Sequence, residues 1–205
     1  ESTRPWYRRV ALEVFCRLYF SEGIQRKSLS PTVLRLHVLP YLDGPVHLSG
    51  SPGSGKTAMC LGVVSDIISD GGSVVWACKE IPNPDRTREI LSDISEGDYE
   101  KISIIHFSDE LLRYRDLIIS LSRTFSKRDI VIVDDWCDNH GRASKGQVMA
   151  VKKLADACMH TNLVITSSSY EDASGESGSK WLSRGGDSVR KIFQTVFLER
   201  HPLKQ

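Results

Sequence analysis

The chain lacks several features that would assign it to a common protein class. None of its apolar runs approaches the roughly 18 residues of a membrane span, and no signal-peptide pattern precedes the first predicted helix of the given sequence. The chain also lacks an excess of either charge, since 27 basic and 26 acidic residues leave a net charge of +1. This balance excludes a chain-wide nucleic-acid footprint, so any basic surface must be local.

Cysteine patterns typical of disulfide scaffolds and zinc modules are scarce. The five cysteines are an odd number and include no C-x-x-C pair, which predicts reduced thiols in a cytosolic or nuclear compartment. Cys137-x-x-His140 and Cys158-x-His160 offer a zinc alternative, which the predicted helix between them disfavours. Internal repeats are absent, and 205 residues suit one α/β domain.

The most informative stretch is glycine-rich and reads GSPGSGKT. It matches the phosphate-binding pattern G-x-x-x-x-G-K-[ST] at every specified position. Its glycines let main-chain N–H groups approach a polyphosphate, its lysine supplies a charge to the β- and γ-phosphates, and its threonine hydroxyl is a ligand for Mg²⁺. The predicted nucleotide-binding residues are Gly50, Ser51, Pro52, Gly53, Ser54, Gly55, Lys56 and Thr57.

The flanking patterns supply the strand and the helix that this motif requires. Residues 44–49 predict a short apolar strand, and residues 58–69 predict a helix that Asp70-Gly71-Gly72 closes. Further apolar strands alternate with amphipathic helices along the rest of the chain. We expect strands at 73–79, 102–107, 129–135, 162–169 and 192–200, helices at 109–125 and 146–160, a loop with one helix at 82–100, and a Ser/Gly-rich loop at 167–188.

This alternation predicts an α/β domain, residues 44–205, with a mainly parallel sheet covered by helices on both faces. An N-terminal helical segment, residues 1–43, is expected to pack on this core through helices at 5–22 and 29–43. Docking of the basic first helix to a partner or to nucleic acid is the alternative. Ligands of such sheets bind beyond the carboxyl ends of the strands.

Three carboxylates follow predicted strands at that edge. Asp134 ends the strand IVIVDD and is the preferred partner of Thr57 in holding Mg²⁺. Its neighbour Asp135 is expected to point to the opposite face, because side chains alternate along a strand. Glu80 follows the second strand, which we expect to lie beside the strand of the glycine-rich loop. It is our candidate for orienting the attacking water, and Asp135 is the rival base.

Two loops at the same edge carry basic residues among small ones. Residues 137–147 and 167–191 suit contact with single-stranded DNA, where backbone charge and base stacking supply affinity. A merely solvated loop is the alternative, because acidic residues dilute the second loop. The candidate DNA contacts are Arg142, Lys145, Lys180, Arg184, Arg190 and Lys191.

With these motifs in this order, the chain resembles the RecA/RadA class of P-loop ATPases. The strand and helix expected at 102–125, before the Asp134 strand, distinguish it from AAA+ loaders. It is similar to short recombinase paralogs, such as the ATPase partner of SWIM-domain proteins in Shu-type complexes. It departs from recombinases in placing serines at 167–169, where they usually have Gln or Asn, and in having Trp136 after the acidic pair.

The resemblance implies an ATP- and Mg²⁺-binding subunit, weakly active alone, in a heteromeric complex that assists recombination on single-stranded DNA. The implied partner is another recombinase paralog or a SWIM-domain subunit, and the implied location is nuclear in a eukaryote or cytoplasmic in an archaeon or bacterium. Two alternatives remain: a scaffold whose interface ATP stabilises, and an AAA+-like helicase loader. The loader is tested by whether residues 102–107 form a strand beside the Asp134 strand. A small-molecule kinase is less favoured, since no substrate lid is evident.

Overall fold

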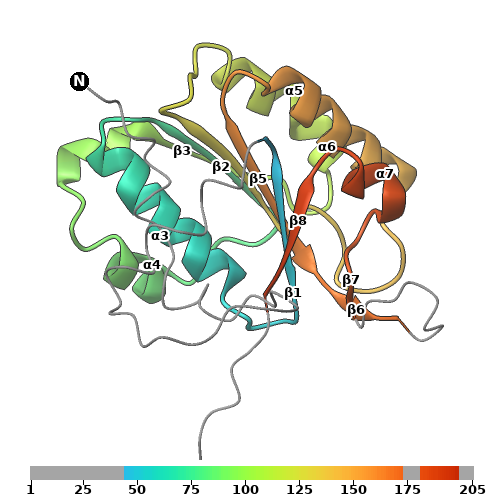
Figure 1. Cartoon of the computed structure of the whole chain (residues 1–205). Helices are drawn as coiled ribbons and strands as arrows, with labels where there is room; N and C mark the ends of the chain where they lie inside the picture. Colours follow the sequence, from blue (N-terminus) through green and yellow to red (C-terminus); the bar gives the residue numbers. More distant parts are fainter. Residues whose placement is uncertain (1–43, 173–180, 199–205) are drawn as a thin grey trace, which may run out of the picture.

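The computed structural model describes residues 44–172 and 181–198. The expected N-terminal helical segment, residues 1–43, lies outside the described residues. Within them, a central sheet carries helices on both of its faces (Figure 1). Its six strands lie in the order β3-β2-β4-β5-β1-β8, and all their pairings are parallel. The predicted α/β architecture with a mainly parallel sheet is therefore confirmed.

Each predicted strand is present, with ends shifted by a few residues. β1, β2 and β4 are short and buried along their whole length, as expected where a sheet is covered on both faces, whereas the edge strands β3 and β8 are partly exposed. The bounds are β1 Val46–Gly50, β2 Val74–Cys78, β3 Ile102–His106, β4 Ile130–Asp134, β5 Asn162–Ser168 and β8 Gln194–Leu198.

Within the described residues, the helices predicted at 58–69, 109–125 and 146–160 and the one expected within 82–100 are also present, while η3 and α7 were not predicted separately. Helix α3 ends as predicted at the glycine pair, because Gly71 has φ 80° and its N–H donates to the Ile68 carbonyl, while the Gly72 N–H donates to the Ile67 carbonyl. The bounds are α3 Lys56–Ser69, α4 Pro84–Ile90, a 3₁₀ helix η3 Glu96–Lys101, α5 Leu111–Leu121, α6 Lys145–Ala157 and α7 Gly186–Arg190.

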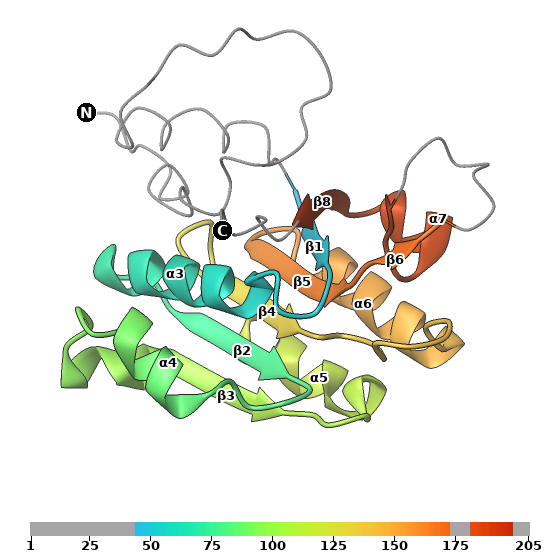
Figure 2. The same cartoon turned by 90° about the horizontal axis from the view of Figure 1, so that it is seen from below.

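Alternation along the strands divides the core into two layers. In β4, Val131 and Val133 pack with α5 and α6, whereas Ile130 and Ile132 pack with α3. The two sets of helices lie on opposite sides of the sheet (Figure 2). The next residue on the α3 face of β4 is Asp134, so the strand period alone directs this carboxylate toward the helix that follows the glycine-rich loop.

The order of the strands corrects one expectation. β2, which precedes Glu80, lies between β3 and β4, so β5 and β4 separate it from β1. The prediction that the second strand lies beside the strand of the glycine-rich loop is wrong. β3 pairs with β2 at the edge of the sheet rather than with the Asp134 strand. Strand order depends on the path of each crossover, which local sequence patterns do not report.

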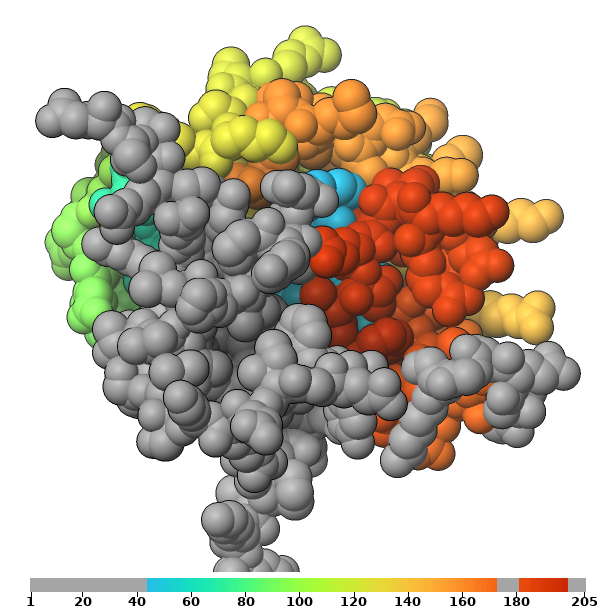
Figure 3. Space-filling model, viewed as in Figure 1, coloured from blue at the N-terminus to red at the C-terminus, as the bar shows by residue number. Residues whose placement is uncertain are grey.

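The Ser/Gly-rich segment is more structured than a loop. Strands β6 Tyr170–Glu171 and β7 Trp181–Leu182 pair antiparallel, and α7 follows them. Helix α7 packs against α6, and in the space-filling view the red C-terminal residues lie beside the orange surface (Figure 3). This places the hairpin and α7 next to the carboxyl end of β5, where the candidate DNA-contact loop was expected.

The apolar side chains of α5 are only partly covered. Leu111 and Ile118 are buried, but Leu117 and Leu121 of the same helix are 46% and 39% exposed. The pattern locates the apolar stripe of a helix, and how much of that stripe is covered depends on the neighbouring elements.

Candidate nucleotide site

The glycine-rich loop joins β1 to α3 at the carboxyl edge of the sheet. Gly53 and Gly55 have φ of 73° and 92°, in the left-handed region that favours glycine. Gly50 is needed for a different reason, since a Cβ there would lie 2.5 Å from the Leu198 carbonyl oxygen and 2.6 Å from Ser54 Oγ. The Ser54 N–H donates to the Ser51 carbonyl at 3.0 Å and closes the turn. The loop is therefore tightly wound against β8.

Lys56 lies along this loop instead of extending into solvent. Its side chain is buried, and Nζ donates to the carbonyls of Gly50 at 3.1 Å and Ser51 at 3.4 Å. Lys56 also begins α3, whose first N–H groups have no intrahelical acceptor, and the Met59 N–H is the first to bond back to the Gly55 carbonyl. A fixed ammonium and a helix N-terminus thus lie at one place, a combination that favours anions.

Asp134 lies across the loop from Lys56 and is held by two threonines. Thr57 Oγ1 donates to Asp134 Oδ2 at 3.0 Å, and Thr166 Oγ1 donates to Asp134 Oδ1 at 2.7 Å. Burial raises the pKa of Asp134 to about 6, although the Thr166 hydrogen bond opposes the shift. The structure therefore brings together the two predicted metal ligands, Thr57 and Asp134.

Asp135 adopts an unusual conformation beside this pair. Its φ of 52° lies in the left-handed region, which is rare for a residue with a side chain. Its N–H donates to Thr166 Oγ1 at 2.8 Å, and its Oδ1 is buried with no hydrogen-bond partner among the described residues. Burial raises the pKa of Asp135, the Lys56 charge opposes this, and Glu80 adds to it. Asp135 is thus within electrostatic reach of Lys56 and Glu80.

Glu80 follows β2 on an exposed bend. The preceding residue, Lys79, is tightly held, since Nζ pairs with Asp109 at 2.6 Å and with Asp138. Burial of the ammonium lowers its pKa, but the bonds to Asp109 and Asp138 outweigh this and raise the pKa of Lys79 to about 12. The His106 ring also lies 3.0 Å from the Lys79 carbonyl. Glu80 therefore extends from a fixed backbone at the edge that carries the loop and Asp134.

Arg184 occupies a role that the sequence did not indicate. Its side chain is buried, and its guanidinium donates to the carbonyls of Gly141 and, at 2.6 Å, Asn139. The same guanidinium lies 4.9 Å from the centre of the Tyr170 ring. Ser168 Oγ donates to Asn139 Oδ1 at 2.5 Å. Arg184 thus fastens the loop after β4 to the hairpin after β5.

The other candidate DNA contacts have different surroundings. Arg142, Lys145 and Lys191 are exposed, with Lys145 at the start of α6. Arg190 is exposed but pairs with Asp187 at 2.5 Å. Lys180 lies outside the described residues.

A buried histidine lies behind the loop in β1. Trp136 Nε1 donates to His47 Nε2 at 3.4 Å, so Nε2 is the acceptor nitrogen, and Ser167 Oγ lies 2.8 Å from it. Burial lowers the pKa of His47 to about 3, which keeps the ring neutral. Ser167, the first of the three serines at 167–169, therefore bonds into the core instead of extending toward the loop.

Sequence reasoning missed Thr166, His47 and the role of Arg184. Thr166 could have been suspected, because a hydroxyl residue at the end of a buried strand beside an acidic strand end can bond that carboxylate. The polar residue inside the apolar run PVHLS was a signal for His47. No local pattern marks Arg184, since its partners are main-chain carbonyls on a distant loop.

The donor set has the chemistry that a magnesium–nucleotide complex requires. The lysine and the start of α3 suit phosphate, while the Thr57 hydroxyl and the Asp134 carboxylate are oxygen ligands of the kind Mg²⁺ takes alongside phosphates. Ser54 Oγ is buried and has no partner among the described residues, so a hydrogen-bonding group remains free in the loop. The described part of the chain contains no cluster of three or more His, Cys, Asp or Glu side chains.

Comparison with known proteins adds no family to this description. No protein-family model matches the chain, and no curated protein matches it significantly. Across residues 44–172 and 181–198, none of the helices combines the length and apolar character needed to cross a bilayer.

Proposed function

We propose that the chain is a RecA-type ATPase subunit that binds Mg²⁺ and ATP and hydrolyses ATP weakly. The observation that carries this proposal is the bond between Thr57 and Asp134, because it places a hydroxyl and a carboxylate beside the buried Lys56 at the mouth of the glycine-rich loop. In this assignment the loop N–H groups and Lys56 hold the phosphates, and Thr57 and Asp134 hold the metal. The metal supplies charge neutralisation of the phosphates when bound.

Hydrolysis requires a group that orients the attacking water. We assign this role to Glu80, which is exposed at the same edge, with Asp135 as the alternative. Catalysis would then be positioning and electrostatic stabilisation rather than covalent chemistry. Glu80→Gln should abolish turnover and preserve nucleotide binding, whereas a wild-type rate in that variant, together with loss of turnover in Asp135→Asn, would transfer the role to Asp135.

We further propose that the protein acts in recombinational DNA repair within a heteromeric complex. The support is the resemblance stated above, together with β3 and α5 lying between β2 and β4 in the chain. The test given above for the AAA+-like loader does not exclude it, because the strand within residues 102–107, β3, pairs with β2 and not with the Asp134 strand. Contact with single-stranded DNA would fall to the exposed Arg142, Lys145 and Lys191.

Nucleotide binding is tested by titrating a fluorescent ATP analogue with and without Mg²⁺. We expect Lys56→Ala to abolish binding, and Thr57→Ala to remove the dependence on Mg²⁺. Unchanged nucleotide affinity in Lys56→Ala would overturn the proposal. DNA contact is tested by titrating the protein with a single-stranded oligonucleotide at several salt concentrations. The affinity should fall as salt rises, because contacts with phosphates release counterions and added salt opposes that release. Absence of binding at low salt would remove the DNA part alone.

A second candidate function is a scaffold in which bound ATP stabilises a protein interface and hydrolysis is vestigial. It is favoured by Ser167, whose bond to His47 keeps it in the core and away from the loop. ATPase measurements with and without single-stranded DNA separate the two candidates. A scaffold would show no turnover in either condition, and its Lys56→Ala variant would lose partner binding.

A further inference from the structure

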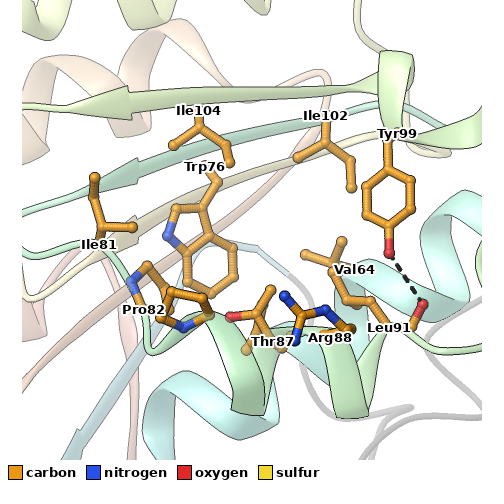
Figure 4. A pocket seen from close by; sticks show the side chains of 12 residues that line it. Val64, Trp76, Ile81, Pro82, Thr87, Arg88, Leu91, Tyr99, Ile102 and Ile104 are labelled. Carbon is orange, nitrogen blue, oxygen red and sulfur yellow. Dashed lines mark hydrogen bonds between the residues drawn. The ribbon is translucent and has the colours of Figure 1, made fainter. Parts of the chain in front are cut away.

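An apolar pocket opens at the β3 edge of the sheet, away from the glycine-rich loop (Figure 4). Its volume is about 480 Å³, and α3, β2, α4, η3 and β3 all contribute to its walls. Trp76 and Val64 are among its buried lining residues, with 3% and 1% exposure. Ile81, Ile104 and Tyr99 remain 63%, 62% and 42% exposed at its rim. Isoleucines this exposed, next to a buried tryptophan, mark an interaction surface.

The pocket exists because α4 is too short to cover this face of the sheet. Ile104 pairs with Trp76 across β3 and β2, so both side chains lie on the α4 face. An apolar strand of a parallel sheet is normally covered on both faces. Here α4 spans only seven residues, begins at Pro84 and buries none of its own side chains. The apolar face of β3 is left open to solvent.

The segment around the pocket carries an excess of negative charge. Residues 81–101 contain six acidic and three basic side chains. Each basic side chain already pairs with an acidic one three positions away, at 2.6 to 3.1 Å. Three exposed carboxylates in residues 93–100, the segment that includes Tyr99, take no part in these pairs. They are Asp93, Glu96 and Glu100.

We propose that this pocket is the docking site for a segment of a protein partner that presents one large apolar side chain flanked by lysine or arginine. The apolar group fills the space over Trp76, between Ile81 and Ile104. The flanking cations pair with the carboxylates that the segment 81–101 leaves over. Burial of the anchor supplies affinity, and the charges select and orient the partner.

The pocket lies next to Glu80, the residue proposed to orient the attacking water. Ile81 and Pro82 line the pocket and directly follow Glu80. A partner that packs on them changes the surroundings of the Glu80 carboxylate, so binding would change the rate of ATP hydrolysis. This consequence alone rests on the proposed function, and the docking site stands without it.

The test is a selection from random peptides of about 12 residues displayed on phage, run against the full chain and counter-selected against its Ile104→Asp variant. We expect enriched peptides to share an aromatic or large aliphatic residue with Lys or Arg neighbours. The best peptide is then synthesised and titrated calorimetrically. Ile104→Asp should weaken its binding by about tenfold or more, because it places a charge against the apolar anchor. If Ile104→Asp fails to fold, Ile81→Asp on the exposed loop replaces it.

Charge is tested separately with exposed positions. Glu96→Lys combined with Glu100→Lys should weaken binding severalfold, and the control Asp156→Lys on exposed α6 should leave it unchanged. Selection of no peptide, or of peptides that bind Ile104→Asp as tightly as wild type, would overturn the docking site. The charge preference would be overturned if the selected peptides lacked Lys and Arg and bound the Glu96→Lys, Glu100→Lys double variant as tightly as wild type. Because none of these readouts uses ATP, their failure is distinct from failure of the proposed function.

Discussion

Thr57 Oγ1 donates a 3.0 Å hydrogen bond to Asp134 Oδ2, joining the first turn of α3 to the end of β4 across 77 positions of sequence. Thr166 Oγ1 donates to the other carboxylate oxygen at 2.7 Å. Two threonines from different elements therefore set the orientation of one buried carboxylate, and α3, β4 and β5 meet at this point.

Replacing Thr166 with valine tests that arrangement. The change keeps the side-chain volume but removes the bond to Asp134 and the acceptor for the Asp135 N–H. We expect Mg²⁺-dependent nucleotide affinity to fall by about tenfold, as for other groups that orient metal ligands. Unfolding free energy should fall by about 1–3 kcal/mol, because a buried N–H loses its partner. Fluorescent nucleotide titration and urea unfolding measure both effects.

Thr195→Val on β8 is the matched control. Thr195 Oγ1 is buried without a hydrogen-bond partner among the described residues, so its loss leaves no group unpaired. This variant should be as stable as wild type or more stable, with unchanged nucleotide affinity. Equal effects from both variants would refute a specific role for Thr166.

The raised pKa of Asp134 makes its contribution to stability depend on pH. With a pKa of about 6 in the folded protein and about 3.9 when unfolded, the folded state holds the proton more tightly, so stability from this group falls as pH rises from about 4 to 6. Asp134→Asn should therefore exceed wild type in unfolding free energy by about 1–3 kcal/mol at pH 8, with the difference shrinking toward zero near pH 4. Urea unfolding without nucleotide across this range is the measurement. A difference independent of pH would contradict the assignment.

His47 acts in the opposite direction. Its pKa of about 3 lies below the ordinary histidine value, so its neutral ring favours folding above about pH 6.5 and this contribution is lost as pH falls toward 3. His47→Gln cannot take up a proton. From pH 7 to 5, the stability of this variant relative to wild type should rise by about 2 kcal/mol. The same relative stability at both pH values would show that His47 does not control acid sensitivity.

Gly50→Ala tests the close packing of the loop. The added Cβ would meet the Leu198 carbonyl oxygen at 2.5 Å, a backbone atom that cannot swing away. We expect a loss of about 1–3 kcal/mol in unfolding free energy, in the range of overpacked cores, together with weaker nucleotide binding. Gly62→Ala in the middle of α3 is the control. Nothing lies within 4 Å of its Cβ position, so helix propensity should stabilise that variant by about 0.5–1 kcal/mol.

Substitutions of Arg184 distinguish its structural role from the DNA contact predicted from the sequence. Arg184→Lys keeps the charge but loses the planar fork that spans the Asn139 and Gly141 carbonyls. Hydrogen exchange of residues 137–144 should accelerate in this variant, whereas Arg142→Lys at an exposed position should leave it unchanged. Wild-type exchange in Arg184→Lys, together with loss of DNA affinity in Arg184→Gln, would restore the DNA contact predicted from the sequence.

Local patterns predicted most elements because each has its own signal. The apolar run before Asp134 indicated a strand buried on both faces, and the carboxylate at its end was the preferred partner of Thr57. Alternation predicted only that Asp134 and Asp135 point to opposite faces. The position of Glu80 in the sheet was predicted wrongly, because strand order depends on which neighbours each crossover passes. The hairpin and α7 were missed since glycine and serine suit both loops and tight turns. The Arg184 contacts with main-chain carbonyls leave no trace in side-chain composition.

The pairing of β1 has a consequence for how the protein is made. Val46 pairs with Val164 and with Gln194, so both neighbours of this strand are synthesised more than a hundred residues after it. During synthesis, β1 and the glycine-rich loop leave the ribosome before β5 and β8, the two strands that pair with β1, have been made. Domains whose pairings span long sequence separations fold slowly and expose strand edges meanwhile. A transcript truncated before Leu198 would yield a chain that carries the whole phosphate motif without the strand that Gly50 packs against.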